Sequence, residues 1–211
     1  MTHVQAFDAA FARCPLVAIL RGVRPDEVEA IGDALVEAGF AIIEVPLNSP
    51  DPFDSIARLA GRLDGRAVIG AGTVLHVDNM LRVEAAGGTV IIAPNVNVRV
   101  IEAAAQRGLV AMPGMSTPTE AFAALDAGAA ALKLFPAEAA SPAVLKAMRA
   151  VLPKDTRVLP VGGINPDAMA AWRAVGAAGF GLGSALYAPG MSAADVGERA
   201  RQFVAALANS G

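Results

Sequence analysis

Short apolar runs alternate with longer amphipathic runs along the whole chain. The apolar runs show no regular alternation with polar residues, which is typical of parallel strands covered by helices on both faces. The amphipathic runs carry apolar residues three or four positions apart, and several end at a glycine, which predicts helices. We expect strands over 17–20, 41–47, 67–74, 89–94, 109–113, 130–135, 157–161 and 179–182. We expect the matching helices over 25–38, 52–63, 77–86, 98–107, 117–128, 142–152, 166–175 and 193–208.

These segments make eight strand–helix units with no break in composition between them. We therefore predict one domain over residues 1–211, of the α/β class, with the (β/α)8 architecture of a TIM barrel. An open, doubly wound parallel sheet is the structural alternative. The even spacing of eight units favours closure into a barrel.

Composition narrows the range of partners. Hydrophobic residues make up 55% of the 211-residue chain and the formal net charge is −3, so we expect a large core, no nucleic-acid partner and no membrane association. Residues 1–13 lack the apolar core of a signal peptide, and Cys14, as the single cysteine, cannot form an internal disulfide. These features favour a cytoplasmic protein. The two histidines, His3 and His76, are too far apart in sequence to suggest a metal site, so we expect no metal.

One lysine interrupts the most apolar of the predicted strands. If Leu132 and Leu134 face the helices, alternation turns Lys133 toward the barrel interior. Desolvation there would lower the pKa of the amine and leave it free to form a Schiff base with a ketone. The structural alternative is a strand-end lysine that extends to solvent.

Glu44 is the same kind of exception on the second predicted strand, within Ile42-Ile-Glu-Val45. A buried carboxylate at this place can take and return protons beside a Schiff base. The alternative is a purely structural salt bridge with Lys133 or Arg21.

Two further polar residues end strands of the same predicted barrel. Arg21 ends the first strand, and its planar guanidinium suits a substrate carboxylate. Thr73 ends the third strand after Gly70-Ala-Gly72, where a ligand can approach the backbone. Polar groups at the carboxyl ends of several strands are the arrangement that barrel enzymes use for catalysis.

Glycines supply a candidate anion site after the last two strands. Gly162 and Gly163 end the seventh strand and Asn165 caps the helix after it, while Gly183 and Ser184 end the eighth. Barrel enzymes commonly bind phosphate at this position through backbone N–H groups and a helix N-terminus.

Several motifs, in order along nearly the whole chain, resemble the class I 2-keto-3-deoxy-6-phosphogluconate aldolase family. They are Ile42-Ile-Glu-Val45, Ile69-Gly-Ala-Gly-Thr-Val74, Met112-Pro-Gly-Met-Ser-Thr117, Leu132-Lys-Leu-Phe-Pro-Ala-Glu138 and Val161-Gly-Gly163.

The resemblance implies a role for each candidate. Lys133 would be the Schiff-base lysine, Glu44 the general acid/base, and Thr73 with an arginine would bind the pyruvyl half of the substrate. The resemblance also implies a homotrimer that needs no cofactor or metal. The residues that it implies hold the phosphate are Gly162, Gly163, Gly183 and Ser184. Phe135 either shields the imine or is ordinary packing.

Two departures bear on the substrate. Asn48 stands where the phosphogluconate branch has an arginine, and Ala93-Pro94-Asn95 replaces its S-P-G. Both resemble the sister branch that acts on 2-dehydro-3-deoxy-6-phosphogalactonate, and Pro94 and Asn48 are therefore expected at the substrate site. With Asn48 in this place, carboxylate binding falls to Arg21.

The expected reaction is cleavage of this phosphorylated 2-keto-3-deoxy sugar acid to pyruvate and glyceraldehyde 3-phosphate. The first alternative is the phosphogluconate epimer, or both epimers. More remote alternatives are a phosphate-binding barrel isomerase or epimerase, and a non-catalytic barrel that binds a phosphometabolite.

Overall fold

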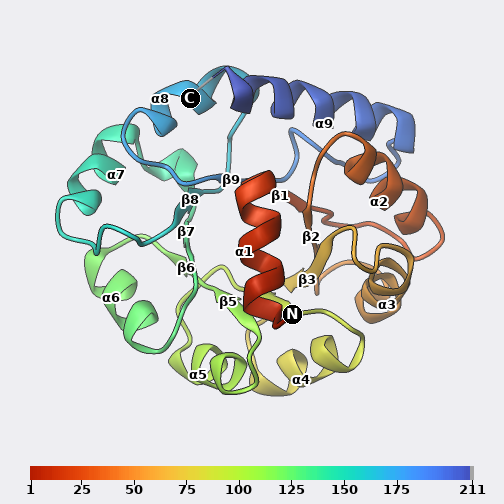
Figure 1. The fold of residues 1–211 in the computed structure, drawn as a ribbon, viewed down its shortest axis with the longest axis horizontal. Helices are drawn as coiled ribbons and strands as arrows, with labels where there is room; N and C mark the ends of the chain where they lie inside the picture. Colours follow the sequence, from red (N-terminus) through yellow and green to blue (C-terminus); the bar gives the residue numbers. More distant parts are fainter. Residues whose placement is uncertain (210–211) are drawn as a thin grey trace.

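The computed structural model of the protein describes residues 1–209, and its helices surround a core of strands (Figure 1). The strands are β1 (Leu16–Ile19), β2 (Ile42–Pro46), β3 (Val68–Gly72), β4 (Val90–Ile92), β5 (Val110–Met112), β6 (Gly114–Met115), β7 (Leu132–Leu134), β8 (Val158–Pro160) and β9 (Phe180–Leu182). The α-helices are α1 (His3–Arg13), α2 (Val28–Glu37), α3 (Pro52–Arg62), α4 (Val77–Ala85), α5 (Val98–Gln106), α6 (Pro118–Asp126), α7 (Pro142–Arg149), α8 (Met169–Arg173) and α9 (Ala193–Ala208). Two short 3-10 helices are η1 (Ala137–Ala139) and η2 (Pro166–Ala168).

All strand pairs are parallel, which confirms the α/β class. The strands form two ladders, β5-β4-β3-β2-β1-β9 and β6-β7-β8, and not one continuous eight-stranded ladder. The single strand expected over 109–113 is wrong: β5 and β6 are separated by Pro113, which has no N–H to donate to a ladder. Val161 and Gly181 form an isolated parallel bridge beside the ends of β8 and β9.

Successive strand residues face two different apolar layers. Val17 and Ile42 belong to a cluster inside the ring of strands, whereas Ala18 and Ile43 belong to the cluster between the strands and the surrounding helices. Buried parallel strands are therefore apolar on both faces, as their sequence indicated. A charged side chain among them has to point into one of these two layers.

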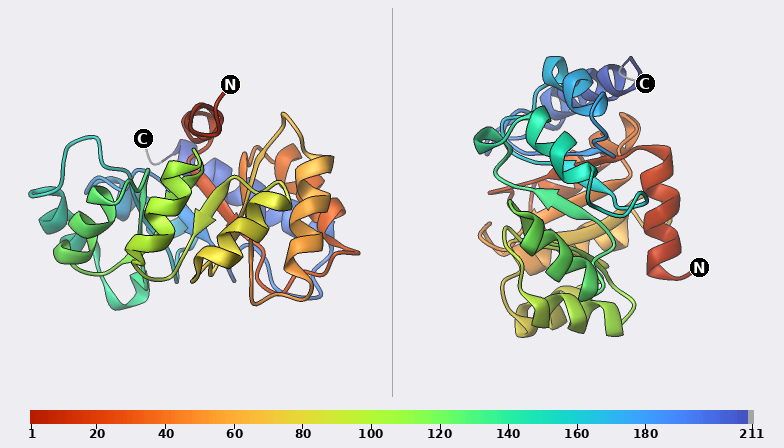
Figure 2. Two further views of the ribbon diagram at one scale, coloured as in Figure 1. Left: turned by 90° about the horizontal axis from the view of Figure 1, so that it is seen from below. Right: turned by 90° about the vertical axis from the view of Figure 1, so that its left-hand side faces the viewer.

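Helix α1 lies across one end of the ring of strands (Figures 1 and 2). No helix was expected before residue 25, yet Phe7, Ala10 and Phe11 have the i, i+3, i+4 spacing of a helix that buries one face. These three residues pack in the inner cluster with the first residues of the strands. A capping box between Thr2 and Gln5 fixes the start of α1.

Capping signals set other helix boundaries. Thr117 accepts a hydrogen bond from the N–H of Glu120 (3.3 Å), and the Glu120 carboxylate accepts one from the N–H of Thr117 (2.9 Å), which confirms the predicted start of α6. The start predicted for α2 is wrong, because Pro25 lies in a turn and the helix begins at Val28. Within the described residues, no helix is both long and apolar enough to cross a membrane.

Candidate active site

Lys133 and Glu44 both point toward the inside of the ring of strands. Lys133 lies on β7 and is 6% exposed, while its neighbours Leu132 and Leu134 pack in the outer cluster. Glu44 lies on β2 and is 2% exposed, and its neighbours Ile43 and Val45 also pack in the outer cluster. The structure thus places two ionisable groups in an apolar interior.

Burial acts on both groups in the direction that favours their neutral forms. It lowers the pKa of the Lys133 amine, an effect that the negative charge of Glu44 opposes and the positive charge of Arg21 reinforces. Burial raises the pKa of the Glu44 carboxyl, and the positive charges of Lys133 and Arg21 oppose this. A less basic lysine beside a more basic carboxylate is an arrangement suited to nucleophilic attack and proton transfer.

A glycine on the neighbouring strand makes the space for Glu44. A side chain at Gly72 on β3 would overlap the Glu44 carboxylate. Among the described residues, Oε2 of Glu44 has no hydrogen-bond partner, and no ion pair within 4.0 Å joins Glu44 to Lys133 or Arg21. The alternative of a purely structural salt bridge therefore has no support in this geometry.

The side chain of Arg21 is hydrogen-bonded to that of Asn48. Nη1 of Arg21 donates a hydrogen bond of 2.7 Å to Oδ1 of Asn48, although the two residues are far apart in sequence. Both side chains are exposed at the carboxyl ends of β1 and β2. Asn48 accordingly orients the guanidinium.

A cavity of about 410 Å³ opens beside Lys133. Seven of the expected site residues line it, namely Arg21, Lys133, Phe135, Gly162, Gly163, Gly183 and Ser184. The Phe135 ring centre lies 4.6 Å from Nζ of Lys133. Chain segments from both ladders thus meet at one cavity.

Four expected residues do not line this cavity. Glu44 acts on Lys133 through its charge, and Asn48 contacts Arg21. Thr73 is half-buried directly after Gly72, with a φ of 59°. Pro94 is also half-buried, and its carbonyl group lies against Gly114, the residue that pairs with Lys133.

The backbone of Thr73 is unusual. A positive φ is uncommon outside glycine, and for a β-branched residue it is a strained conformation that occurs most often at functional sites. The position follows the glycine that makes room for Glu44. The strained backbone of Thr73 and the carboxylate of Glu44 therefore both lie at the carboxyl end of β3.

The glycine-rich turns present backbone donors to the cavity. Gly162 and Gly163 have φ values of 109° and 65°. Within residues 1–209, no backbone carbonyl accepts a hydrogen bond from the N–H groups of Gly163, Gly183 or Ser184. These open N–H groups are suited to an anion.

The structure places at the site further residues for which no role was predicted from the sequence. Glu138 and Val161 line the cavity, and the side chain of Glu138 lies against the Gly162–Gly163 turn. The buried hydroxyl of Tyr187 donates a hydrogen bond of 3.0 Å to Glu27, which joins the loops after β9 and β1. Neither contact has a signal in the sequence, because each depends on how distant loops fold together.

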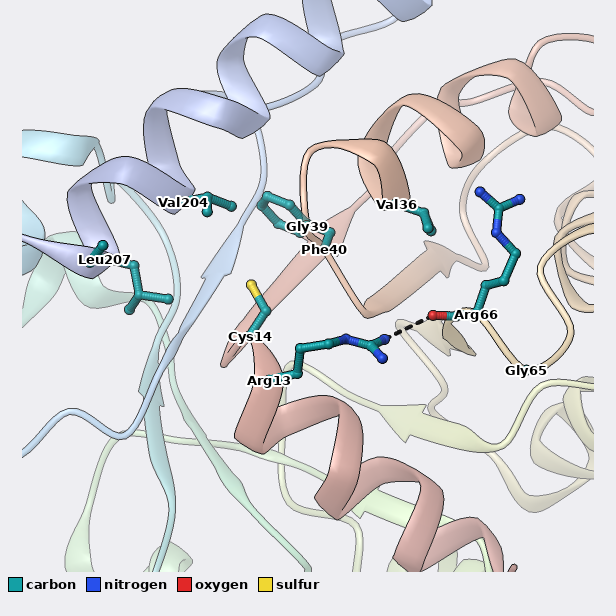
Figure 3. Close-up of a pocket in the computed structure, with 10 residues that line it drawn as sticks. Arg13, Cys14, Val36, Gly39, Phe40, Gly65, Arg66, Val204 and Leu207 are labelled. Carbon is teal, nitrogen blue, oxygen red and sulfur yellow. Dashed lines mark hydrogen bonds between the residues drawn. The ribbon is translucent and has the colours of Figure 1, made fainter.

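A second cavity, of about 710 Å³, lies near the amino ends of β1 and β2 (Figure 3). Arg13 donates a hydrogen bond of 2.9 Å to the carbonyl of Arg66 beside it. Burial raises the pKa of the Cys14 thiol, which disfavours the reactive thiolate. The lining residues that the structure describes include no carboxylate and no lysine, so this cavity lacks the groups for acid/base or Schiff-base chemistry.

The described part of the chain contains no candidate metal site. No group of three or more histidine, cysteine, aspartate or glutamate side chains comes together there in a way that could hold an ion. The groups that the structure does bring to the candidate site are a buried amine, a buried carboxylate and a glycine-rich turn.

Known proteins resemble this chain over most of its length. A protein named "Probable 2-dehydro-3-deoxy-6-phosphogalactonate aldolase" from Rhizobium meliloti (strain 1021) is 50% identical over 192 residues, 91% of each chain. The 2-dehydro-3-deoxy-6-phosphogalactonate aldolase of Escherichia coli (strain K12) is 45% identical over 194 residues, 92% of this chain and 95% of its own. A solved structure titled "Native KDPGal structure" superposes with a TM-score of 0.92 at 44% identity, over 94% of this chain and 96% of that one.

The family described as "KDPG and KHG aldolase" matches residues 7–201. This range includes every residue of the site described above. The chain belongs to the KDPG and KHG aldolase family.

Proposed function

We propose that this chain is a class I aldolase that cleaves 2-dehydro-3-deoxy-6-phosphogalactonate to pyruvate and D-glyceraldehyde 3-phosphate. The observation that carries the proposal is the buried pair of Lys133 and Glu44 beside a cavity with open backbone donors. The names of the curated relatives support the substrate.

The reaction begins at Lys133. Its neutral amine attacks the C2 ketone to give a carbinolamine, which loses water to form an iminium. Burial supports this step, because it lowers the pKa of the amine. Phe135, whose ring lies beside Nζ, covers the imine.

Glu44 then moves the protons. Its carboxylate takes the proton of the C4 hydroxyl through a water molecule, the C3–C4 bond breaks, and its electron pair passes to the iminium. Glyceraldehyde 3-phosphate leaves, C3 of the remaining enamine is protonated, and hydrolysis releases pyruvate and Lys133. The raised pKa of Glu44 supports this role, because a stronger base accepts the hydroxyl proton more readily.

The remaining site residues hold the two ends of the substrate. Arg21, oriented by Asn48, binds the carboxylate. Thr73 and Pro94 flank the pyruvyl half. The phosphate is bound at the other end by Gly162, Gly163, Gly183 and Ser184, which the open N–H groups of the last three support.

Borohydride reduction in the presence of pyruvate tests the covalent step. We expect a reduced pyruvyl group on the peptide that contains Lys133, and none after Lys133→Ala. Label on another lysine would contradict the class I assignment.

Side-by-side kinetics on the two C4 epimers test the substrate. We expect the higher kcat/KM for the phosphogalactonate epimer, because a misplaced hydroxyl leaves buried polar groups unpaired. A preference for the phosphogluconate epimer would overturn the substrate and leave the Schiff-base mechanism standing.

The assembly extends the proposal. The described residues, 1–209, form one domain whose two ladders act as one closed (β/α)8 barrel, supported by the Val161–Gly181 bridge and by the hydrogen bond of 2.9 Å from the Lys133 N–H to the Pro113 carbonyl. The protein works as a cytoplasmic homotrimer. A mass of three chains in light scattering would agree with this assembly, and a monomeric mass would contradict it.

A further inference from the structure

Glu138 is a negatively charged residue that lines the cavity with the candidate anion site. It lies on η1, directly after the strand that carries Lys133, and it lines the same cavity. A side chain at Gly162 would overlap the Glu138 carboxylate, and a Cβ at Gly163 would lie 2.7 Å from its Cγ. The whole Glu138 side chain therefore rests on the glycine turn.

No polar contact holds the carboxylate there. Within the described residues, Glu138 makes no hydrogen bond and no ion pair, although it is exposed to solvent. Glu120 on α6 differs, because its carboxylate accepts hydrogen bonds from the N–H groups of Ser116 and Thr117. Glu138 is consequently free to turn toward solvent.

The Glu138 carboxylate and the open N–H groups of the glycine-rich turns lie at the same cavity. The open N–H groups of Gly163, Gly183 and Ser184 suit an anion, yet a negative side chain already covers the turn. Two like charges a few ångströms apart repel each other, so a carboxylate at this place opposes the binding of a phosphate to the same turns.

We propose that Glu138 is an acidic gate on the phosphate subsite and thereby a determinant of anion affinity. In the free enzyme its carboxylate covers the Gly162–Gly163 turn, and the substrate phosphate displaces it to solvent. Its return favours release of the phosphorylated aldehyde. This inference rests on the proposed function, because it requires that the phosphate bind at the turn.

Glu138→Gln tests the gate, since it keeps the shape of the side chain and removes the charge. We expect the variant to bind inorganic phosphate about threefold to tenfold more tightly, the size expected for charges near one another in a solvent-exposed site. Calorimetric titration with inorganic phosphate measures this without turnover. The KM of the phosphorylated substrate should fall by a similar factor, and inhibition by glyceraldehyde 3-phosphate should strengthen.

A matched control separates the local charge from net charge. Glu102→Gln makes the same change in net charge at an exposed position on α5, outside the cavity lining. We expect its phosphate affinity and KM to equal those of the wild type. An equal gain in both variants would overturn the gate.

Two further outcomes would also overturn it. Unchanged or weaker phosphate binding by Glu138→Gln would show that the carboxylate does not oppose the anion. An equal fall in KM for a substrate without phosphate would show that the effect is not on the phosphate subsite. Pyruvate trapping on Lys133, measured in the same preparations, reports on the proposed function separately, since Glu138 does not take part in imine formation.

Discussion

Glu44 keeps a carboxylate oxygen buried without a partner, which costs stability and which a structural residue would avoid. The space for it exists only because Gly72 has no side chain. The same burial raises the pKa of the carboxyl and makes it a better base. The loss of stability at this residue and the raised pKa of its carboxyl have one physical cause, which is burial.

Replacing Glu44 by glutamine should separate proton transfer from imine formation. We expect kcat for cleavage to fall by about 10²–10⁴, the usual contribution of a positioned general base. Imine trapping on Lys133 should persist. Cleavage at the wild-type rate would assign Glu44 a structural role.

The same variant should shift the pH dependence of trapping. Trapping rises with pH as the Lys133 ammonium loses its proton, and the negative charge of Glu44 raises the pKa of this lysine against the effect of burial. Removing the charge should lower the pKa further, so the midpoint should move to lower pH. A midpoint that moved to higher pH would show that the two groups are not coupled in this way.

Single residues were predictable where a charge broke an apolar pattern. Lys133 and Glu44 stand out in their strands, and strand alternation gave their inward direction. The partner of Arg21 was not predictable, because the contact with Asn48 depends on how two loops approach. Glu138 ends one of the family motifs, but its contact with the Gly162–Gly163 turn was not predictable for the same reason.

At the level of elements, the loops after β1 and β9 are joined as one unit. Tyr187 donates to Glu27, and a side chain at Gly22 would lie within 2.8 Å of Pro189. Burial and the Glu27 carboxylate raise the pKa of Tyr187, so its hydroxyl remains a donor at any working pH. The loop that carries Arg21 is thereby tied to the loop that carries Ser184.

Tyr187→Phe removes this link and little else. The free energy of unfolding should fall by roughly 1–2 kcal/mol, as for a hydrogen bond to a charged group. The KM of the phosphorylated substrate should rise, because the loops that carry Arg21 and Ser184 lose this connection. Denaturant titration and steady-state kinetics measure the two effects, and an unchanged KM would mean that the loops hold their positions independently.

Helix α1 should contribute to stability without affecting chemistry. Phe7 is 0% exposed beneath the strands, so Phe7→Ala should lower the free energy of unfolding by about 3–5 kcal/mol. Val4 lies on the same helix and is 40% exposed, and Val4→Ala should leave stability nearly unchanged. Urea unfolding distinguishes the two, and equal losses would contradict the packing described for α1.

Element boundaries show the limits of sequence patterns. The helix over 193–208 was predicted to the residue, because its serine cap and periodicity agree. Helix α1 was overlooked, although its apolar residues have helical spacing. Pro113 divides a strand because it has no N–H to donate, and the hydrophobic pattern of the segment does not show this.

On the scale of the whole molecule, the two ends of the ring of strands differ in chemistry. The amino ends of the strands pack on α1 in an apolar cluster, whereas the carboxyl ends carry the charged and glycine-rich positions. The repeat of strand and helix predicted that the polar positions share one end, because all parallel strands end on the same side, whereas α1 at the other end was not expected. The division of the strands into two ladders was not predictable from the repeat of strand and helix.

Chelation tests the chemistry of the whole site. In the proposed mechanism the iminium on Lys133 is the electron sink, so no step requires a metal ion. We expect turnover to be unchanged after treatment with EDTA and dialysis. A loss that Zn²⁺ or Mg²⁺ restored would contradict the class I mechanism.

The position of α1 also matters for handling the enzyme. Because α1 lies across the amino ends of the strands, a tag or fusion partner attached ahead of Thr2 would extend from the face opposite the candidate substrate entrance. An enzyme immobilised through such a tag would present the face with the candidate active site to the solution. The fold therefore suits attachment to a solid support through its first helix.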